Sequence, residues 1–99
     1  MLHTVNKAPF GNDTLARCLQ VAKPGSAVLL IEDGVYGALR GSAAADMVTK
    51  ATANVEVYAL EGDVNTRGIQ DKVLDGIKLI DYGTFVELAT QHDRVQAWL

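Results

Sequence analysis

Five short segments of the chain are rich in apolar residues and have the length of β-strands. The run at residues 27–31, AVLLI, is continuously apolar, as expected of a strand covered on both faces in a parallel sheet. The runs at residues 55–60 and 77–80 alternate more between apolar and polar positions, which predicts strands nearer an edge. Residues 2–5 are predicted to form the opening strand and residues 95–99 a final short strand.

A helix is predicted between the opening strand and the run at residues 27–31. Asn12 or Asp13 can cap its amino end, and Pro24-Gly25 ends it. Its apolar residues recur at spacings of three and four, which places them on one helix face: Leu15, Cys18, Leu19 and Ala22.

Two more helical segments are predicted before the run at residues 55–60. Residues 34–39 favour a short helix closed by Gly41, and Ser42 can cap the helix that follows. That second helix directs four apolar residues inward: Ala43, Met47, Val48 and Ala51.

The second half of the chain continues the alternation of strands and helices. Residues 63–67 form at most two helical turns, whereas Thr84 and Glu87 have the T-x-x-E spacing of a capping box that begins the last helix. Strands that alternate with helices imply right-handed crossovers between parallel strands. The pattern therefore predicts an α/β fold: a single three-layer domain over residues 1–99, with a mostly parallel sheet of four to five strands and helices on both faces.

The composition is 48% hydrophobic and 21% charged, which is richer in apolar residues than an average domain. Part of that apolar excess is expected on a surface that faces a partner. The net charge is -3 and the nine Lys and Arg residues are scattered, so nucleic acid is not expected as a direct partner. No apolar run approaches the roughly 20 residues that span a bilayer, and we expect a cytoplasmic protein without membrane attachment.

Acidic residues follow three of the predicted strands: Glu32 and Asp33, then Glu61 and Asp63, then Asp81. Ligands of open parallel sheets usually bind outside the carboxyl ends of the strands, so this acidic rim is a candidate site. A nucleotide is not expected there, because the chain lacks both the G-x-G-x-x-G pattern and the P-loop lysine.

Asp33 and Asp81 each allow two interpretations. The favoured one makes them helix caps at strand-to-helix turns, with Gly34 supplying backbone freedom after Asp33. The alternative makes them catalytic carboxylates, which requires surroundings that separate their pKa values. A small-ligand site that uses this rim predicts a pocket bounded by Asp33 and Asp81.

The two histidines, His3 and His92, lie far apart and lack metal-ligand spacing, so neither a metal nor another cofactor is expected. His3 lies in the apolar opening strand, where a hydrogen-bonded structural histidine is favoured over a functional one. Trp98, near the end of the chain, is predicted to be an anchor in the core or in a subunit contact.

Cys18 is the only cysteine, so no intrachain disulfide can form. A nucleophilic cysteine needs thiolate character from a helix N-terminus, a cation or a histidine. Cys18 lies about five residues into its helix, beyond the first turn, and its apolar neighbours raise a thiol pKa. A structural role is favoured, and Cys18 can carry sulfur only if this helix face is open.

Five stretches of the sequence together match a known family: MLHTVNKAPF, LLIEDGVYGAL, VYAL followed by RG, IDYGTFVELAT and the terminal VQAW. They run from Met1 to the last residues and leave little to explain as an insertion. On these stretches the chain resembles the DsrH/TusB family of sulfur-relay proteins, whose fold is DsrEF-like.

The resemblance implies a small subunit of a cytoplasmic heterohexamer that also contains DsrE/TusD-type and DsrF/TusC-type subunits. Such complexes pass persulfide sulfur between cysteines and on to a DsrC/TusE-type carrier. The sulfur-accepting cysteine of the family lies in a loop of the DsrE/TusD-type subunit, where this chain has carboxylates. The resemblance therefore implies a non-catalytic or accessory subunit. His3, Asp33, Asp81 and Trp98, singled out above by their positions, are the candidates for its rim or interface.

The family has two branches, and the stretches HTVNKAPF, EDGVYGAL and VQAWL look closer to the DsrH branch, as does a cysteine in the first helix. That branch implies a DsrEFH-type complex for the oxidation of intracellular sulfur, which is the main prediction. The first alternative is a TusB-like subunit of the relay that thiolates the wobble uridine of certain tRNAs. The second is an independent persulfide sulfurtransferase that uses Cys18.

Overall fold

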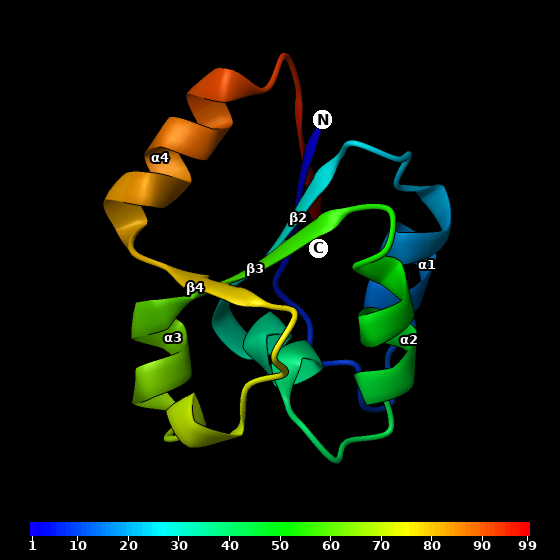
Figure 1. Cartoon of the computed structure of the whole chain (residues 1–99), viewed down its shortest axis with the longest axis vertical. Coiled ribbons are helices and arrows are strands. Elements are labelled where there is room, and N and C mark those ends of the chain that lie inside the picture. Colours follow the sequence, from blue (N-terminus) through cyan, green and yellow to red (C-terminus); the bar gives the residue numbers. More distant parts are fainter.

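Five parallel strands form the centre of the computed structural model, which describes all 99 residues (Figure 1). Their order across the sheet is β4-β3-β2-β1-β5, so β2 is the middle strand and β4 and β5 are the edges. The strands are β1 (Leu2–Val5), β2 (Ala27–Leu30), β3 (Glu56–Leu60), β4 (Lys78–Ile80) and β5 (Val95–Trp98). The parallel five-stranded sheet confirms the predicted fold class.

The burial of the strands follows their place in this order. All four residues of β2 are buried, as its continuous apolar run predicts. β4 lies at an edge, also as predicted, and has the exposed Lys78 at its start. β3 also lies nearer an edge than β2, as predicted, although it is not the edge itself, because β4 pairs with its outer side.

Helices cover both faces of the sheet, which makes the three predicted layers. In Figure 1, α1 and α2 lie on the right of the strands and α4 lies on the upper left. The helical segments are α1 (Thr14–Val21), η1 (Glu32–Ala38), α2 (Ala45–Ala51), α3 (Glu61–Thr66), η2 (Gln70–Lys72) and α4 (Tyr82–Gln91), of which η1 and η2 are 3-10 helices.

Two hydrophobic clusters hold these layers together, one on each face of the sheet. The larger cluster joins α1, η1, α2 and α3 to the strands through residues such as Leu15, Val28 and Val64. The smaller cluster lies under α4, where Leu29 and Ile80 meet the partly buried Phe85. The α4 layer is thin, since none of its own residues is buried.

The predicted caps of α2 and α4 are both wrong. Ser42 does not cap α2, because its backbone N–H donates to Leu39 and its carbonyl accepts from Ala45, which makes a turn before the helix begins at Ala45. Ala43, predicted to point inward, is exposed in that turn. Thr84 does not cap α4 either, because the helix begins two residues before it. The backbone N–H of Thr84 instead donates to the carboxylate of Asp81, the residue that precedes the helix.

Candidate functional site

The acidic rim at the carboxyl ends of β2 and β3 is held together by Arg67, which the sequence analysis did not single out. Its guanidinium donates to Asp33 Oδ1 from Nη2 at 2.9 Å and from Nε at 3.1 Å. The same group donates from Nη1 to the backbone carbonyl of Asp63 at 3.2 Å. Arg67 therefore offsets part of the negative charge of the rim and ties η1 to the end of α3.

Asp33 is not a helix cap, which corrects the favoured interpretation. It lies inside η1, whose preceding residue is Ile31, and its carboxylate is bound by Arg67 instead. The carboxylate that accepts a backbone N–H at this turn belongs to Asp63. Its Oδ2 accepts the Glu32 N–H at 2.7 Å. Glu32 has a φ of 51°, the left-handed conformation that side chains disfavour, so the Asp63 carboxylate supports a strained residue.

The prediction that Gly34 supplies backbone freedom is also wrong. Glycine is required here because a larger side chain has no room, and not because of an unusual φ. Its φ is ordinary, but a Cβ built on it would overlap the carbonyl oxygen of Val5 and lie 2.9 Å from the carbonyl carbon. The Val5 carbonyl also accepts the Ile31 N–H at 3.0 Å. Only glycine lets η1 pass this close to the end of β1.

Asp81 is a helix cap, one of the two interpretations left open for it. Its Oδ1 accepts the Thr84 N–H at 2.8 Å at the start of α4, and this hydrogen bond holds the pKa of Asp81 below its usual range. The predicted pocket bounded by Asp33 and Asp81 is absent, because both cavities of the molecule lie elsewhere and include neither residue. A rim site for a small ligand therefore lacks the cavity it requires.

Cys18 lies in the larger hydrophobic cluster and has an exposed fraction of 0%. It faces the sheet from α1, and burial raises the pKa of its thiol to about 12. No histidine or cation offsets this burial, since removal from water is the only cause of the shift. In the folded chain this thiol is neither charged near neutral pH nor open to a sulfur donor.

His3 and Trp98 meet because β5 pairs with β1. Trp98 aligns with Val5, and parallel strands direct alternate residues to the same face, so the indole reaches back toward His3. Trp98 Nε1 donates to His3 Nδ1 at 3.1 Å. His3 lies in the middle of β1 and not at its carboxyl end, and its side chain is buried.

This contact determines which nitrogen of His3 carries the proton. Burial, followed by the positive charge of the amino terminus, lowers the pKa of His3, so the ring is neutral at pH 7. Because Nδ1 accepts the Trp98 N–H, the single ring proton of the neutral imidazole must lie on Nε2.

The pH dependence of stability should report this histidine. Its pKa is lower in the folded chain than the 6.5 of the unfolded chain, so the unfolded chain binds the proton first as the pH falls. We expect the free energy of unfolding in urea to decrease as the pH drops below about 6.5, whereas the Asp81 contribution is lost only below its own, lower range. The variant His3→Gln, which can still accept from Trp98, should show a flatter profile between pH 7.5 and 5.

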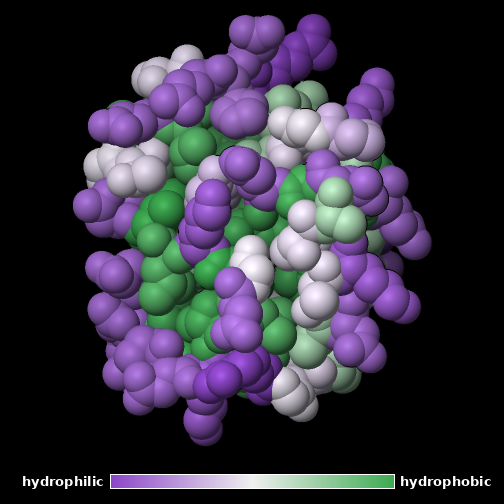
Figure 2. All heavy atoms as spheres, in the orientation of Figure 1, coloured by the Kyte–Doolittle hydropathy of each residue, from purple (hydrophilic) through white to green (hydrophobic).

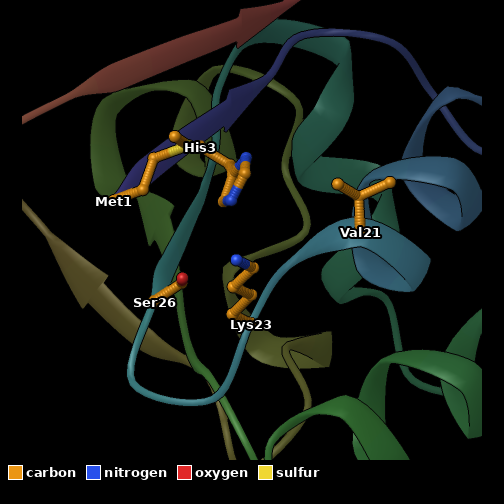
Figure 3. A pocket seen from close by; sticks show the side chains of 5 residues that line it. All are labelled: Met1, His3, Val21, Lys23 and Ser26. Carbon is orange, nitrogen blue, oxygen red and sulfur yellow. The ribbon is translucent and has the colours of Figure 1, made fainter.

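A cavity of about 160 Å³ opens beside His3 at the amino ends of β1 and β2, away from the acidic rim (Figure 3). Its lining consists of Met1, His3, Val21, Lys23 and Ser26. Figure 3 shows the Lys23 amine, the His3 ring and the Ser26 hydroxyl directed toward a shared space. The second cavity, between the loop before α1 and the start of α2, is lined by Pro9, Asn12, Asp13, Ala16, Ala43, Ala44 and Met47.

Apolar side chains are exposed on α4 and along β5. Val95 and Ala97 align with Leu2 and Thr4, so they face the α4 side of the sheet, and Val95 is 50% exposed. The next apolar residue of that alternation, Leu99, is 82% exposed. β5 pairs with no strand on its outer side. Figure 2 shows the molecule from the same side as Figure 1, where apolar surface lies between polar margins.

Two kinds of site are absent from the chain. No helix combines the length and the apolar character needed to cross a bilayer. No three His, Cys, Asp or Glu side chains lie close enough to share a metal ion.

The fold and the sole, buried cysteine define a small parallel α/β domain without an exposed sulfur nucleophile, and comparison with known proteins assigns its family. The family model described as "DsrH like protein" matches residues 7–95. The Protein TusB of Pectobacterium parmentieri is 35% identical over 99 residues, and that of Escherichia coli K12 is 36% identical over 98 residues. Each alignment covers 99% of this chain and 100% of the relative. The chain belongs to the DsrH/TusB family.

Solved structures share the fold at lower sequence identity. The ychN protein from E. coli superimposes with a TM-score of 0.78 at 20% identity, and the alignment covers 97% of both chains. The MTH1491 protein from Methanobacterium thermoautotrophicum, whose function is described as unknown, gives 0.79 at 15% identity and covers 97% of this chain and 96% of its own. At these identities the likeness shows the fold alone.

Proposed function

We propose that this protein is a non-catalytic subunit of a TusBCD-type sulfur relay that serves the 2-thiolation of the tRNA wobble uridine. The observation that carries the proposal is the 35–36% identity to proteins named TusB over essentially the whole chain. These relatives favour the tRNA branch, which was the alternative prediction, over the oxidative DsrEFH branch suggested by a few short stretches and the cysteine in the first helix.

The state of Cys18 supports a role that does not include carrying sulfur. In a relay, an incoming thiolate attacks the outer sulfur of a persulfide, takes that sulfur and releases the first cysteine as a thiolate, with no net redox change. Such a step needs an accessible thiolate at both ends. Cys18 is buried and its pKa is raised to about 12, so the independent sulfurtransferase is the less supported reading.

The exposed side chains of β5 and α4 support a role in assembly. An edge strand with free backbone groups and outward apolar side chains is a liability for a monomer, and a partner subunit can cover it. Val95 on β5, Leu99 directly after it, and Tyr82 and Val86 on α4 are all exposed apolar residues of this kind. We propose that TusC-type and TusD-type subunits are the partners and that a TusE-type carrier receives the sulfur from the assembled complex.

Co-expression tests the assembly. We expect the chain to co-purify with the tagged TusD-type subunit and the TusC-type subunit in a single species whose mass by light scattering requires all three chains. Val95→Lys should reduce the recovered chain about tenfold, which corresponds to about 1.4 kcal/mol of binding free energy. Phe10→Lys is the matched control, because Phe10 is also 50% exposed but lies in the loop before α1. A stable monomer that ignores both partners contradicts the proposal.

A second measurement separates the two branches of the family. The chain is expressed with its own TusC-type and TusD-type partners in a host that lacks its relay complex. We expect 2-thiouridine to return to the tRNA, seen as retarded bands in gels that contain an organomercury compound. Assembly without any return of thiolated tRNA would favour the oxidative branch instead.

A further inference from the structure

The cavity at the amino ends of β1 and β2 presents hydrogen-bond donors and a positive charge, but no acidic group, to one small space. Its three polar side chains are His3, Lys23 and Ser26, and the other two lining residues, Met1 and Val21, are apolar (Figure 3). From this arrangement we propose that the cavity binds a small carboxylate anion that carries a short apolar substituent. This site does not depend on the proposed relay function and lies away from the rim, at the opposite ends of the strands.

The tautomer of His3 makes the ring a donor toward the cavity. The Trp98 indole N–H donates to Nδ1 of His3. The proton of the neutral ring therefore lies on Nε2. Nε2 has no hydrogen-bond partner within the protein, although His3 is only 3% exposed. Nε2 is not sealed from solvent, so it opens to the cavity and can donate to an oxygen acceptor placed there.

Ser26 and Lys23 complete the set of donors. Ser26 is 6% exposed, and its hydroxyl, which has no hydrogen-bond partner in the protein, opens to the cavity. Lys23 forms no ion pair, since the ion pairs of the chain are those of Arg67. Lys23 is exposed, and its unpaired ammonium beside two donors that open to the cavity fits an anion and not a cation, because a cation would meet like charge and no acceptor carboxylate.

The size and the lining of the cavity restrict the ligand further. A volume of about 160 Å³ has room for several water molecules and therefore for a ligand of a few heavy atoms. Met1 and Val21 are large apolar residues, each exposed outside the core, and they can cover an alkyl group. The overall charge of -3 opposes unspecific attraction of anions, so binding has to come from this local arrangement.

Trp98 provides a direct reporter, because it is the only tryptophan and its indole N–H bonds to the same ring that faces the cavity. The experiment adds sodium butyrate, acetate or phosphate to the isolated chain without an amino-terminal tag, with sodium chloride keeping the ionic strength constant. We expect butyrate to shift the NMR resonances of the Trp98 indole N–H and of the His3 and Ser26 backbone amides in a saturable manner. Acetate should bind more weakly than butyrate. Stronger binding of phosphate than of butyrate would overturn the carboxylate assignment.

Two variants that each remove one positive charge distinguish butyrate binding in the cavity from a general effect of charge on the spectrum. Lys23→Gln should weaken butyrate binding about tenfold or more, as expected when a charged hydrogen bond is lost. Lys50→Gln is the matched control, because it removes the same charge from the exposed face of α2, outside the cavity. Equal effects in both variants, shifts that grow linearly without saturation, or no shift at all would each overturn the proposal. The relay proposal is tested by assembly and tRNA thiolation, so the two can fail separately.

Discussion

Native protein should react with a thiol reagent at Cys18 at least about a thousandfold more slowly than the unfolded chain does. The reactive form is the thiolate, and burial raises the pKa of this thiol from 9.0 to about 12, so the thiolate fraction near pH 8 falls by about three powers of ten. The 0% exposed fraction slows the reaction further, because the reagent needs a local opening of α1. The measurement is the alkylation rate by mass spectrometry across a pH series, with and without urea.

The sole cysteine makes this experiment simple to interpret. Any label on the chain reports Cys18, and a variant that combines Cys18→Ala with Thr49→Cys supplies an exposed thiol on α2 as the reference. The reference thiol should react at the rate of a free cysteine in native and unfolded protein alike. Fast labelling of native Cys18, with a midpoint below pH 8, would contradict the non-catalytic assignment and restore Cys18 as a sulfur carrier.

Gly34→Ala should lower the free energy of unfolding by about 3 kcal/mol, the upper part of the range for overpacked sites. The added Cβ would overlap the carbonyl oxygen of Val5, which is backbone and cannot rotate away like the end of a side chain. Either η1 moves outward or the Val5 carbonyl loses its hydrogen bond from Ile31. Urea denaturation of the isolated chain measures the difference.

Gly62→Ala is the matched control for this substitution. Gly62 lies in α3, and a Cβ built there meets nothing within 4 Å. Alanine has a higher helix propensity than glycine, so this variant should be as stable as the original chain or more stable by up to about 1 kcal/mol. If Gly34→Ala proved as stable as Gly62→Ala, the close approach of η1 to β1 would be wrong.

The strands could be predicted well because each is a short apolar run, and burial on both faces of a parallel sheet requires such runs. The face of α1 that carries Leu15 and Cys18 was equally visible, since a helix repeats its buried face every three or four residues. Helix beginnings were harder to predict. Ser42 and Thr84 have the right residue types for caps, but turns and Asp81 determine where α2 and α4 begin.

The acidic residues of the rim were predicted, but the contacts that they make were not. Its acidic residues follow the strands as expected, yet Asp33 is bound by Arg67, which is 34 positions further along the chain. No local pattern identifies that pair, because it depends on how closely η1 and α3 approach one another in the fold.

By itself, the sequence determined the α/β class, the number and positions of the strands, the apolar face that holds Cys18 and, through its resemblance, the family. Those features depend on local periodicity and on stretches that can be read in order along the chain. Only the tertiary structure decided the order of the strands, the pairing of β5 with β1 and the contact between His3 and Trp98, which are 95 positions apart. Such contacts arise when distant segments bury apolar surface together, and that packing also orients the donors of the small cavity beside Lys23.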